Sequence, residues 1–105
     1  MPSTASPRCP VSEQQFQQAV IQLIRVLGLR WYHTADSRRS NKGFPDLLII
    51  GARVLYRELK TAKGRVTVEQ HNWGADLKRA GQSWDVWRPE DLQSGRILRE
   101  LREIL

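Results

Sequence analysis

The sequence predicts a single α/β domain whose elements follow the order α-β-β-β-α-β-α. Three observations predict it: an apolar stripe at helical spacing, two short apolar runs separated by a glycine, and two helix-capping patterns. A chain of 105 residues suits one small domain with one core. We expect residues 1–11, which hold three of the five prolines, to be a flexible lead-in and residues 12–105 to form the domain.

The first helix is predicted to begin after Ser12. Apolar residues then recur at three- and four-residue intervals and form one stripe, namely Phe16, Ala19, Val20, Leu23, Ile24 and Leu27. Ser12 can cap this helix with Gln15 at the reciprocal position of a capping box, and Gly28 can end it. The pattern therefore predicts an amphipathic helix that covers a core.

The remaining elements follow from short runs and caps. Residues 29–34, 46–50 and about 54–60 favour strands, and Thr67 with Gln70 begins a second helix that runs to about residue 80. Apolar and polar side chains alternate along residues 83–88, which favours a final strand. Residues 89–105 are predicted to form one closing helix with an apolar stripe of Ile97, Leu98, Leu101, Ile104 and Leu105.

The hairpin of residues 46–60 carries charges where a buried hairpin should be apolar. If residues 51–53 form a three-residue loop, the pairing that follows places Asp46 opposite Glu58. Lys60 lies on the same face as Glu58, because side chains alternate along a strand. Two opposed carboxylates destabilise a sheet unless a cation lies between them.

A divalent metal explains this arrangement best. Asp46, Glu58 and the backbone carbonyl of Leu59 offer hard oxygen ligands suited to Mg²⁺. The ammonium of Lys60 would then position an attacking water and stabilise charge on a phosphate. Taken singly, Asp46 could cap a turn, and Glu58 with Lys60 could be an exposed pair. Their coincidence within residues 46–60 favours the metal site.

Two helical residues are candidates for supporting this site. Glu13 precedes Phe16 by three residues and Gln70 precedes Trp73 by three, so both lie on the core side of their helices. Glu13 could equally be a surface acid favoured by the helix dipole. Gln70 could complete the capping box, support the site, or do both.

Net charge and composition indicate the partner and the compartment. The formal charge of +6 and a sequence pI of about 10.2 favour a polyanionic partner. Arg38, Arg39 and Lys42 could contact phosphates or simply form a solvated loop. A single cysteine, Cys9, excludes an internal disulfide and a cysteine zinc cluster. No run approaches the roughly 20 apolar residues of a membrane span and no signal peptide is recognisable, so we expect a cytoplasmic protein without membrane contact.

The order of these residues resembles a known nuclease signature. Pro45-Asp46 followed by Glu58-Leu59-Lys60 is similar to the PD-(D/E)XK motif. The wider pattern resembles the VRR-NUC branch, the virus-type replication and repair nucleases. It adds Glu13, the glycine and phenylalanine before Pro45, and Gln70 with its following tryptophan, and it covers about residues 12–92. A PD and ExK pair alone is a weak signal, whereas the ordered set is stronger.

The resemblance implies a restriction-endonuclease-like core, with a central mixed sheet flanked by helices, that cuts phosphodiester bonds with Mg²⁺ or Mn²⁺. It makes Asp46 and Glu58 metal ligands, Lys60 the catalytic lysine, and Glu13 and Gln70 supporting residues. Stand-alone members resemble phage or prophage enzymes that act as homodimers on branched DNA such as four-way junctions. We therefore expect a structure-specific DNA endonuclease that acts as a homodimer.

Two alternatives remain open. The chain could be a non-catalytic nucleic-acid-binding module on a nuclease-like fold, although acids near a phosphate weaken binding unless a metal joins them. It could also be a sequence-specific restriction-type nuclease, but so short a chain leaves little surface for reading bases.

Overall fold

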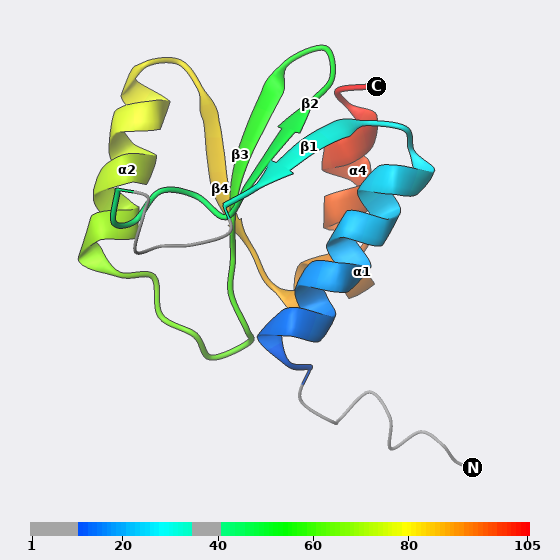
Figure 1. Cartoon of the computed structure of the whole chain (residues 1–105), viewed down its shortest axis with the longest axis horizontal. Helices are drawn as coiled ribbons and strands as arrows, with labels where there is room; N and C mark the ends of the chain where they lie inside the picture. The colour runs from blue at the N-terminus through cyan, green and yellow to red at the C-terminus, as the bar shows by residue number, and fades with distance from the viewer. Residues whose placement is uncertain (1–10, 35–40) are drawn as a thin grey trace.

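The computed structural model describes residues 11–34 and 41–105, and in it the strands form one four-stranded sheet in the order β1-β2-β3-β4 (Figure 1). The strands are β1 (Arg30–His33), β2 (Leu47–Ile50), β3 (Val54–Leu59) and β4 (Ser83–Trp87). β1, β2 and β3 pair antiparallel, whereas β3 and β4 are parallel. The helices are α1 (Glu13–Val26), α2 (Val68–Arg79), α3 (Pro89–Gln93) and α4 (Arg96–Arg102).

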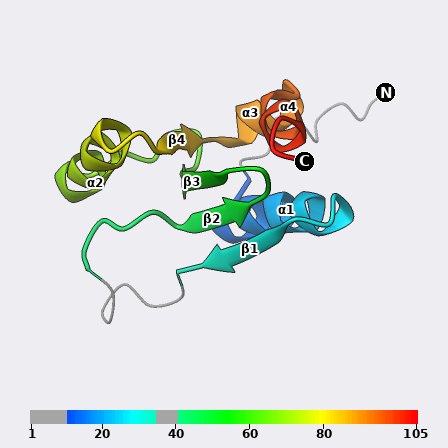
Figure 2. The same cartoon turned by 90° about the horizontal axis from the view of Figure 1, so that it is seen from above.

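Helices cover the two faces of the sheet unequally. Seen from above, α1, α3 and α4 lie on one side of the strands, and α2 lies on the other side near β4 (Figure 2). The core fills the first layer and joins α1 and α4 to alternate strand residues, including Phe16, Val20, Ile24, Leu47, Ile49, Leu55, Leu59, Trp87, Ile97 and Leu101. On the other face, Tyr32 and Ile50 are 61% and 42% exposed, because α2 does not reach β1 and β2.

Both predicted capping boxes are present. The hydroxyl of Ser12 accepts the backbone N–H of Gln15 at 3.0 Å, and the side-chain oxygen of Gln15 accepts the N–H of Ser12 at 3.1 Å. Thr67 and Gln70 make the same pair of bonds at the start of α2. Since each box lies within four residues of sequence, it could be recognised without knowledge of the fold.

The predicted hairpin register is confirmed. Ile50 pairs with Val54, and the pairing continues to Leu47 opposite Arg57. β2 begins at Leu47, so Asp46 lies directly before the strand and not within it. A Cβ added at Gly51 would lie 2.0 Å from the carbonyl oxygen of Ile104, so the turn can pack against the C-terminal segment only with glycine there.

The prediction of one closing helix over residues 89–105 is wrong. The segment forms α3 and α4, and Gly95 between them has a φ of +86°. This left-handed conformation turns the chain and interrupts helical hydrogen bonding. No helix of the described residues is long and apolar enough to cross a membrane.

A buried ion pair, which the sequence did not predict, joins α4 to β3. Arg57 is 4% exposed, and its Nη2 lies 3.0 Å from Oε1 of Glu100. Glu100 also accepts bonds from Trp87 Nε1 at 2.9 Å and from Arg96 Nε at 2.7 Å. Burial raises the pKa of Glu100, but the bond from Trp87 and the charge of Arg57 outweigh this and lower the pKa overall. The closing helices are therefore tied to β3 by charge as well as by apolar packing.

We expect Glu100→Gln to lower the free energy of unfolding by about 3 kcal/mol, because it leaves the Arg57 guanidinium buried without its counter-charge. Glu103→Gln is the matched control, since Glu103 lies 4.0 Å from Arg53 with both side chains more than half exposed; its cost should be about 0–1 kcal/mol. Urea denaturation of both variants measures the difference. Equal costs would show that the buried pair contributes no more than a surface pair.

Candidate active site

Asp46 is held in place by both neighbouring strands. The backbone N–H of Leu59 donates to Oδ2 of Asp46 at 2.9 Å, so the carboxylate continues the hairpin pairing beyond the last backbone pair. On the other side, Thr34 N–H donates to the Asp46 carbonyl at 2.9 Å, and the Thr34 hydroxyl donates to the Pro45 carbonyl at 2.9 Å. These bonds place the carboxylate at the end of the sheet where β2 begins and β3 ends.

The segment before Asp46 is docked on α2. Gly43 has a φ of +89°, and a Cβ there would lie 2.5 Å from the backbone of Glu69. Phe44 packs edge-on against Trp73 with ring centroids 5.0 Å apart, and Trp73 Nε1 donates to the Lys42 carbonyl at 3.1 Å. The glycine and phenylalanine that precede Pro45 therefore fix the approach of the chain to Asp46.

Glu58 is buried on the face of β3 that meets α2. It is 2% exposed, and its Oε2 accepts the side-chain N–H of Gln70 at 2.7 Å. The other end of the same amide accepts the backbone N–H of Thr67 at 2.9 Å. Gln70 thus completes the cap of α2 and also binds Glu58, and its support of a catalytic site stays a prediction.

The Glu58 carboxyl lacks a full set of partners. Its Oε1 is buried and has no hydrogen-bond partner among the described residues. Its Oε2 lies 3.9 Å from Nζ of Lys60. Burial, together with the negative charge of Asp46, raises the pKa of Glu58 to about 9, and the charge of Lys60 only partly opposes this shift. Near neutral pH, Glu58 would therefore be mostly ionised only if an additional cation stabilised its charge.

The donor set fits a hard divalent ion. Asp46, Glu58 and the Leu59 carbonyl are oxygen donors, and the unpartnered Oε1 of Glu58 leaves a buried lone pair for a cation. Mg²⁺ commonly uses one or two carboxylates and keeps several waters. Within residues 11–34 and 41–105, no group of three His, Cys, Asp or Glu side chains gathers to hold a metal. The site therefore offers two acids, with water or substrate completing the ligand set.

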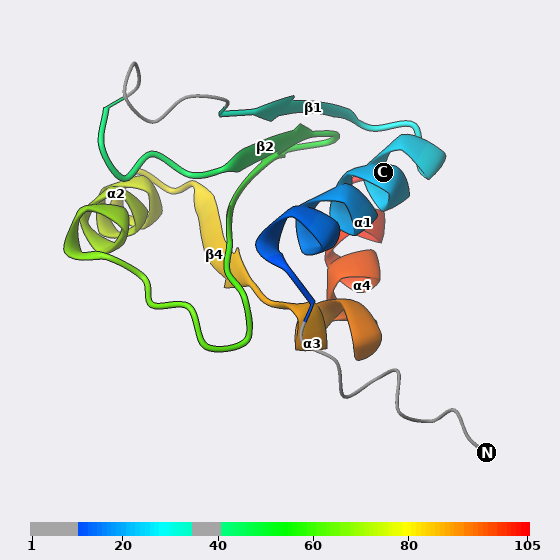
Figure 3. The same ribbon diagram turned by 60° about the horizontal axis from the view of Figure 1, so that its bottom comes forward.

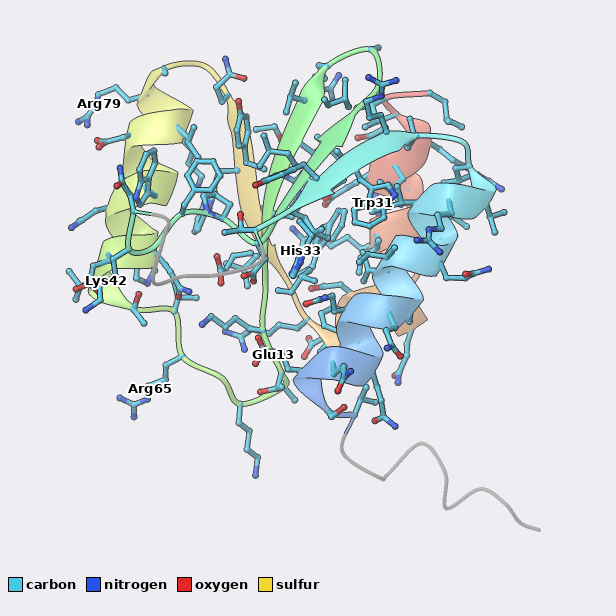
Figure 4. The ribbon with its side chains drawn as sticks, in the orientation of Figure 1. Glu13, Trp31, His33, Lys42, Arg65 and Arg79 are labelled. Carbon is cyan, nitrogen blue, oxygen red and sulfur yellow. The ribbon has the colours of Figure 1, made fainter. Side chains whose placement is uncertain are left out.

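The other predicted residues differ in placement. Glu13 is exposed in the first turn of α1, on the side of the segment that follows β3 (Figure 4). Within the described part of the chain it does not gather with Asp46 and Glu58 into a group of three acids that could hold a metal, and its role stays a prediction. Lys42 is exposed beside α2, whereas Arg38 and Arg39 lie outside the described residues.

Two positioning residues were not predicted. Thr34 holds the Pro45-Asp46 backbone, and Arg88 Nη1 donates to the carbonyls of Thr61 and Gly64 at 2.7 and 2.8 Å. A threonine or arginine at a strand end resembles any surface residue in sequence. Thr34 and Arg88 can be identified as positioning residues only from their place at this end of the sheet, and that place is known only once the order of the strands is known.

Comparisons with known proteins identify the fold. No protein-family model and no curated protein sequence matches the chain. A solved structure described as a VRR_NUC domain protein superposes with a TM-score of 0.75 at 18% identity, over 92% of this chain and 93% of its own. The chain therefore shares the fold of that protein, and the mixed sheet flanked by helices that the resemblance implied is confirmed. At this identity the likeness concerns the fold, and the roles of individual residues stay predictions.

Without divalent ions, the free energy of unfolding should fall as the pH rises from about 4.5 to about 9. Over this range the folded chain keeps the Glu58 proton, whereas the unfolded chain loses it. The stability that Glu58 contributes is therefore complete below its pKa in the unfolded chain and is lost as the pH rises toward its pKa in the folded chain. The slope is at most about 1.4 kcal/mol per pH unit. Denaturation in EDTA at several pH values measures it.

Glu58→Gln removes the ionising group, so this part of the slope should disappear and the metal-free protein should become more stable near pH 8. Glu90→Gln, at an exposed position in α3, serves as the control and should keep the slope. An unchanged slope in Glu58→Gln would contradict the assignment.

Proposed function

We propose that this chain is a Mg²⁺- or Mn²⁺-dependent DNA endonuclease that hydrolyses phosphodiester bonds. One observation carries the proposal: the buried Glu58 lies near Asp46 and Lys60 at the end of a sheet that shares its fold with a VRR_NUC domain protein, and one of its oxygens has no partner in the described part of the chain. A structural carboxylate would be expected to have both oxygens satisfied. The open lone pair favours a site that is completed by a cation.

Each residue of the site would have a different role in the reaction. Asp46, Glu58 and the Leu59 carbonyl would hold the ion, which would supply charge neutralisation at the phosphate and a lower pKa for the attacking water. Lys60 keeps its ammonium near Glu58 with 17% of the side chain exposed, so that it can donate to a phosphate oxygen or orient the water. Gln70 holds one oxygen of Glu58 in a fixed orientation.

The substrate follows from charge and from the fold. A net charge of +6 attracts a polyanion, and the fold is that of a nuclease. We propose branched DNA such as a four-way junction as the preferred substrate, cut by in-line attack of water to leave 5′-phosphate and 3′-hydroxyl ends. Lys42 would contact the DNA backbone, as would Arg38 and Arg39.

Cleavage should depend on Lys60 and on a divalent ion. We expect Lys60→Ala to slow the cutting of a synthetic four-way junction by about 100- to 1000-fold in Mg²⁺ or Mn²⁺, because charge on the phosphate is no longer stabilised. EDTA should stop the reaction. Lys78→Ala, which removes an exposed charge from the last turn of α2, should cut at the normal rate.

The assay compares the junction with a supercoiled plasmid and with linear duplexes made from the same arms. Preference for the junction supports structure specificity. If the unaltered chain binds these DNAs but leaves all of them intact with both ions, the non-catalytic binding module is the better description. Equal cutting of the junction and the duplexes would retain the nuclease and reject the branched substrate.

We propose that the active form is a homodimer, because one chain carries one site and symmetric cutting of two strands needs two. The exposed Tyr32 and Ile50 support this, since they leave apolar surface open on the sheet face away from α1. Light scattering in solution should give twice the chain mass of 12.2 kDa. A single-chain mass at concentrations where the protein cuts DNA would contradict the dimer.

A further inference from the structure

The segment that joins β3 to α2 lies directly beside the candidate active site. It runs from Lys60 to Thr67 and crosses the open end of the sheet between α1 and α2 (Figure 3). Lys63 and Arg65 on it are exposed, and no acid occurs between Glu58 and Glu69. Figure 4 shows the Arg65 side chain pointing outward from this segment. The segment is therefore a compact source of positive charge next to Glu58.

Arg88 holds the backbone of this segment. Its Nη1 donates to the carbonyls of Thr61 and Gly64, and Gly64 N–H donates to the Thr61 carbonyl at 3.2 Å to close a turn. The backbone N–H of Arg88 is itself bonded to Oδ2 of Asp91 at 2.8 Å, which anchors Arg88 at the start of α3. A turn held in this way loses little conformational entropy on binding, because it is already ordered.

The same turn packs closely against Lys60. A Cβ added at Gly64 would lie 3.0 Å from the Thr61 hydroxyl and 3.5 Å from Cδ of Lys60. The turn therefore approaches the stem of the proposed catalytic lysine.

We propose that Lys63 and Arg65 form a phosphate clamp on a turn held by Arg88, and that they bind the DNA backbone next to the scissile phosphate. The proposal rests on the proposed function, whose site it extends. Lys63 and Arg65 contact the DNA, while Arg88 acts as a positioning residue through the turn. Contacts of this kind bind phosphates of any sequence, which suits a structure-specific enzyme.

The test measures DNA binding at several salt concentrations by fluorescence anisotropy, with a labelled four-way junction and with Lys60→Ala present throughout to prevent cleavage. Lys63→Ala with Arg65→Ala should weaken binding about tenfold and reduce the slope of log K against log salt by about 2, since each phosphate contact contributes about 0.9. The matched control is Lys78→Ala with Arg79→Ala, which removes the same charge from the far end of α2 (Figure 4). The control should keep the slope nearly unchanged.

Arg88→Met tests the positioning role. It should weaken binding several-fold on its own, and adding Lys63→Ala and Arg65→Ala to it should then cost less than the same pair costs when Arg88 is present. If Arg88→Met only destabilised the fold, the loss of binding caused by Lys63→Ala with Arg65→Ala would be the same with and without Arg88. Fully additive losses would overturn the role of Arg88.

The outcomes separate the clamp from the nuclease. If the Lys63 and Arg65 pair changes the salt slope no more than the control pair, the clamp is wrong even though the chain cuts DNA. If the unaltered chain binds with the expected slope but cuts nothing, the nuclease is wrong and the clamp stands. Absence of DNA binding at low salt would overturn both.

Discussion

The register in which β2 pairs with β3 is the constraint on which the candidate site depends. Because side chains alternate along a strand, a shift of one residue would move Asp46 to the face opposite Glu58. The register is held at both ends of the hairpin. At the turn, Gly51 packs against the carbonyl of Ile104, and at the open end Asp46 accepts the N–H of Leu59. The carboxylate that would bind the metal thus also fixes the pairing that positions it.

β3 buries an ionisable side chain on each of its faces, and the rest of the chain balances the two side chains differently. Arg57 meets Glu100, Ser83 and the ring of Trp87, so its donors and its charge are balanced within the chain. Glu58 has the amide of Gln70 and the ammonium of Lys60 3.9 Å away, and one of its oxygens has no hydrogen-bond partner among residues 11–34 and 41–105. A buried polar group without a full set of partners is costly, so its presence in a small domain favours a function for Glu58. The balanced ion pair favours a structural role for Arg57.

The end of the sheet is built by segments that are fixed from different directions. The chain before Asp46 is held on α2 by Gly43 and Phe44, and the chain after Lys60 is held on the end of β4 by Arg88. Both segments are irregular, yet each is tied to a regular element by defined contacts. Rigid support of this kind keeps reacting groups at constant separations, which is what positioning a phosphate requires.

Local patterns were sufficient for much of this arrangement. The capping boxes at Ser12 and Thr67 lie within four residues each, and the three-residue loop before Val54 sets the hairpin register, so helix starts and the meeting of Asp46 with Glu58 could be predicted. The break at Gly95 was missed because the apolar stripe that predicted the closing helix begins only at Ile97, beyond the glycine, and gives no sign that the helix is interrupted before it. Other features depend on residues that are distant in sequence. They are the pairing of Arg57 with Glu100, the bonds of Arg88 to the turn, and the burial of Glu58 under α2. Such contacts depend on how α2 and α4 pack on the sheet, and no short-range periodicity records that packing.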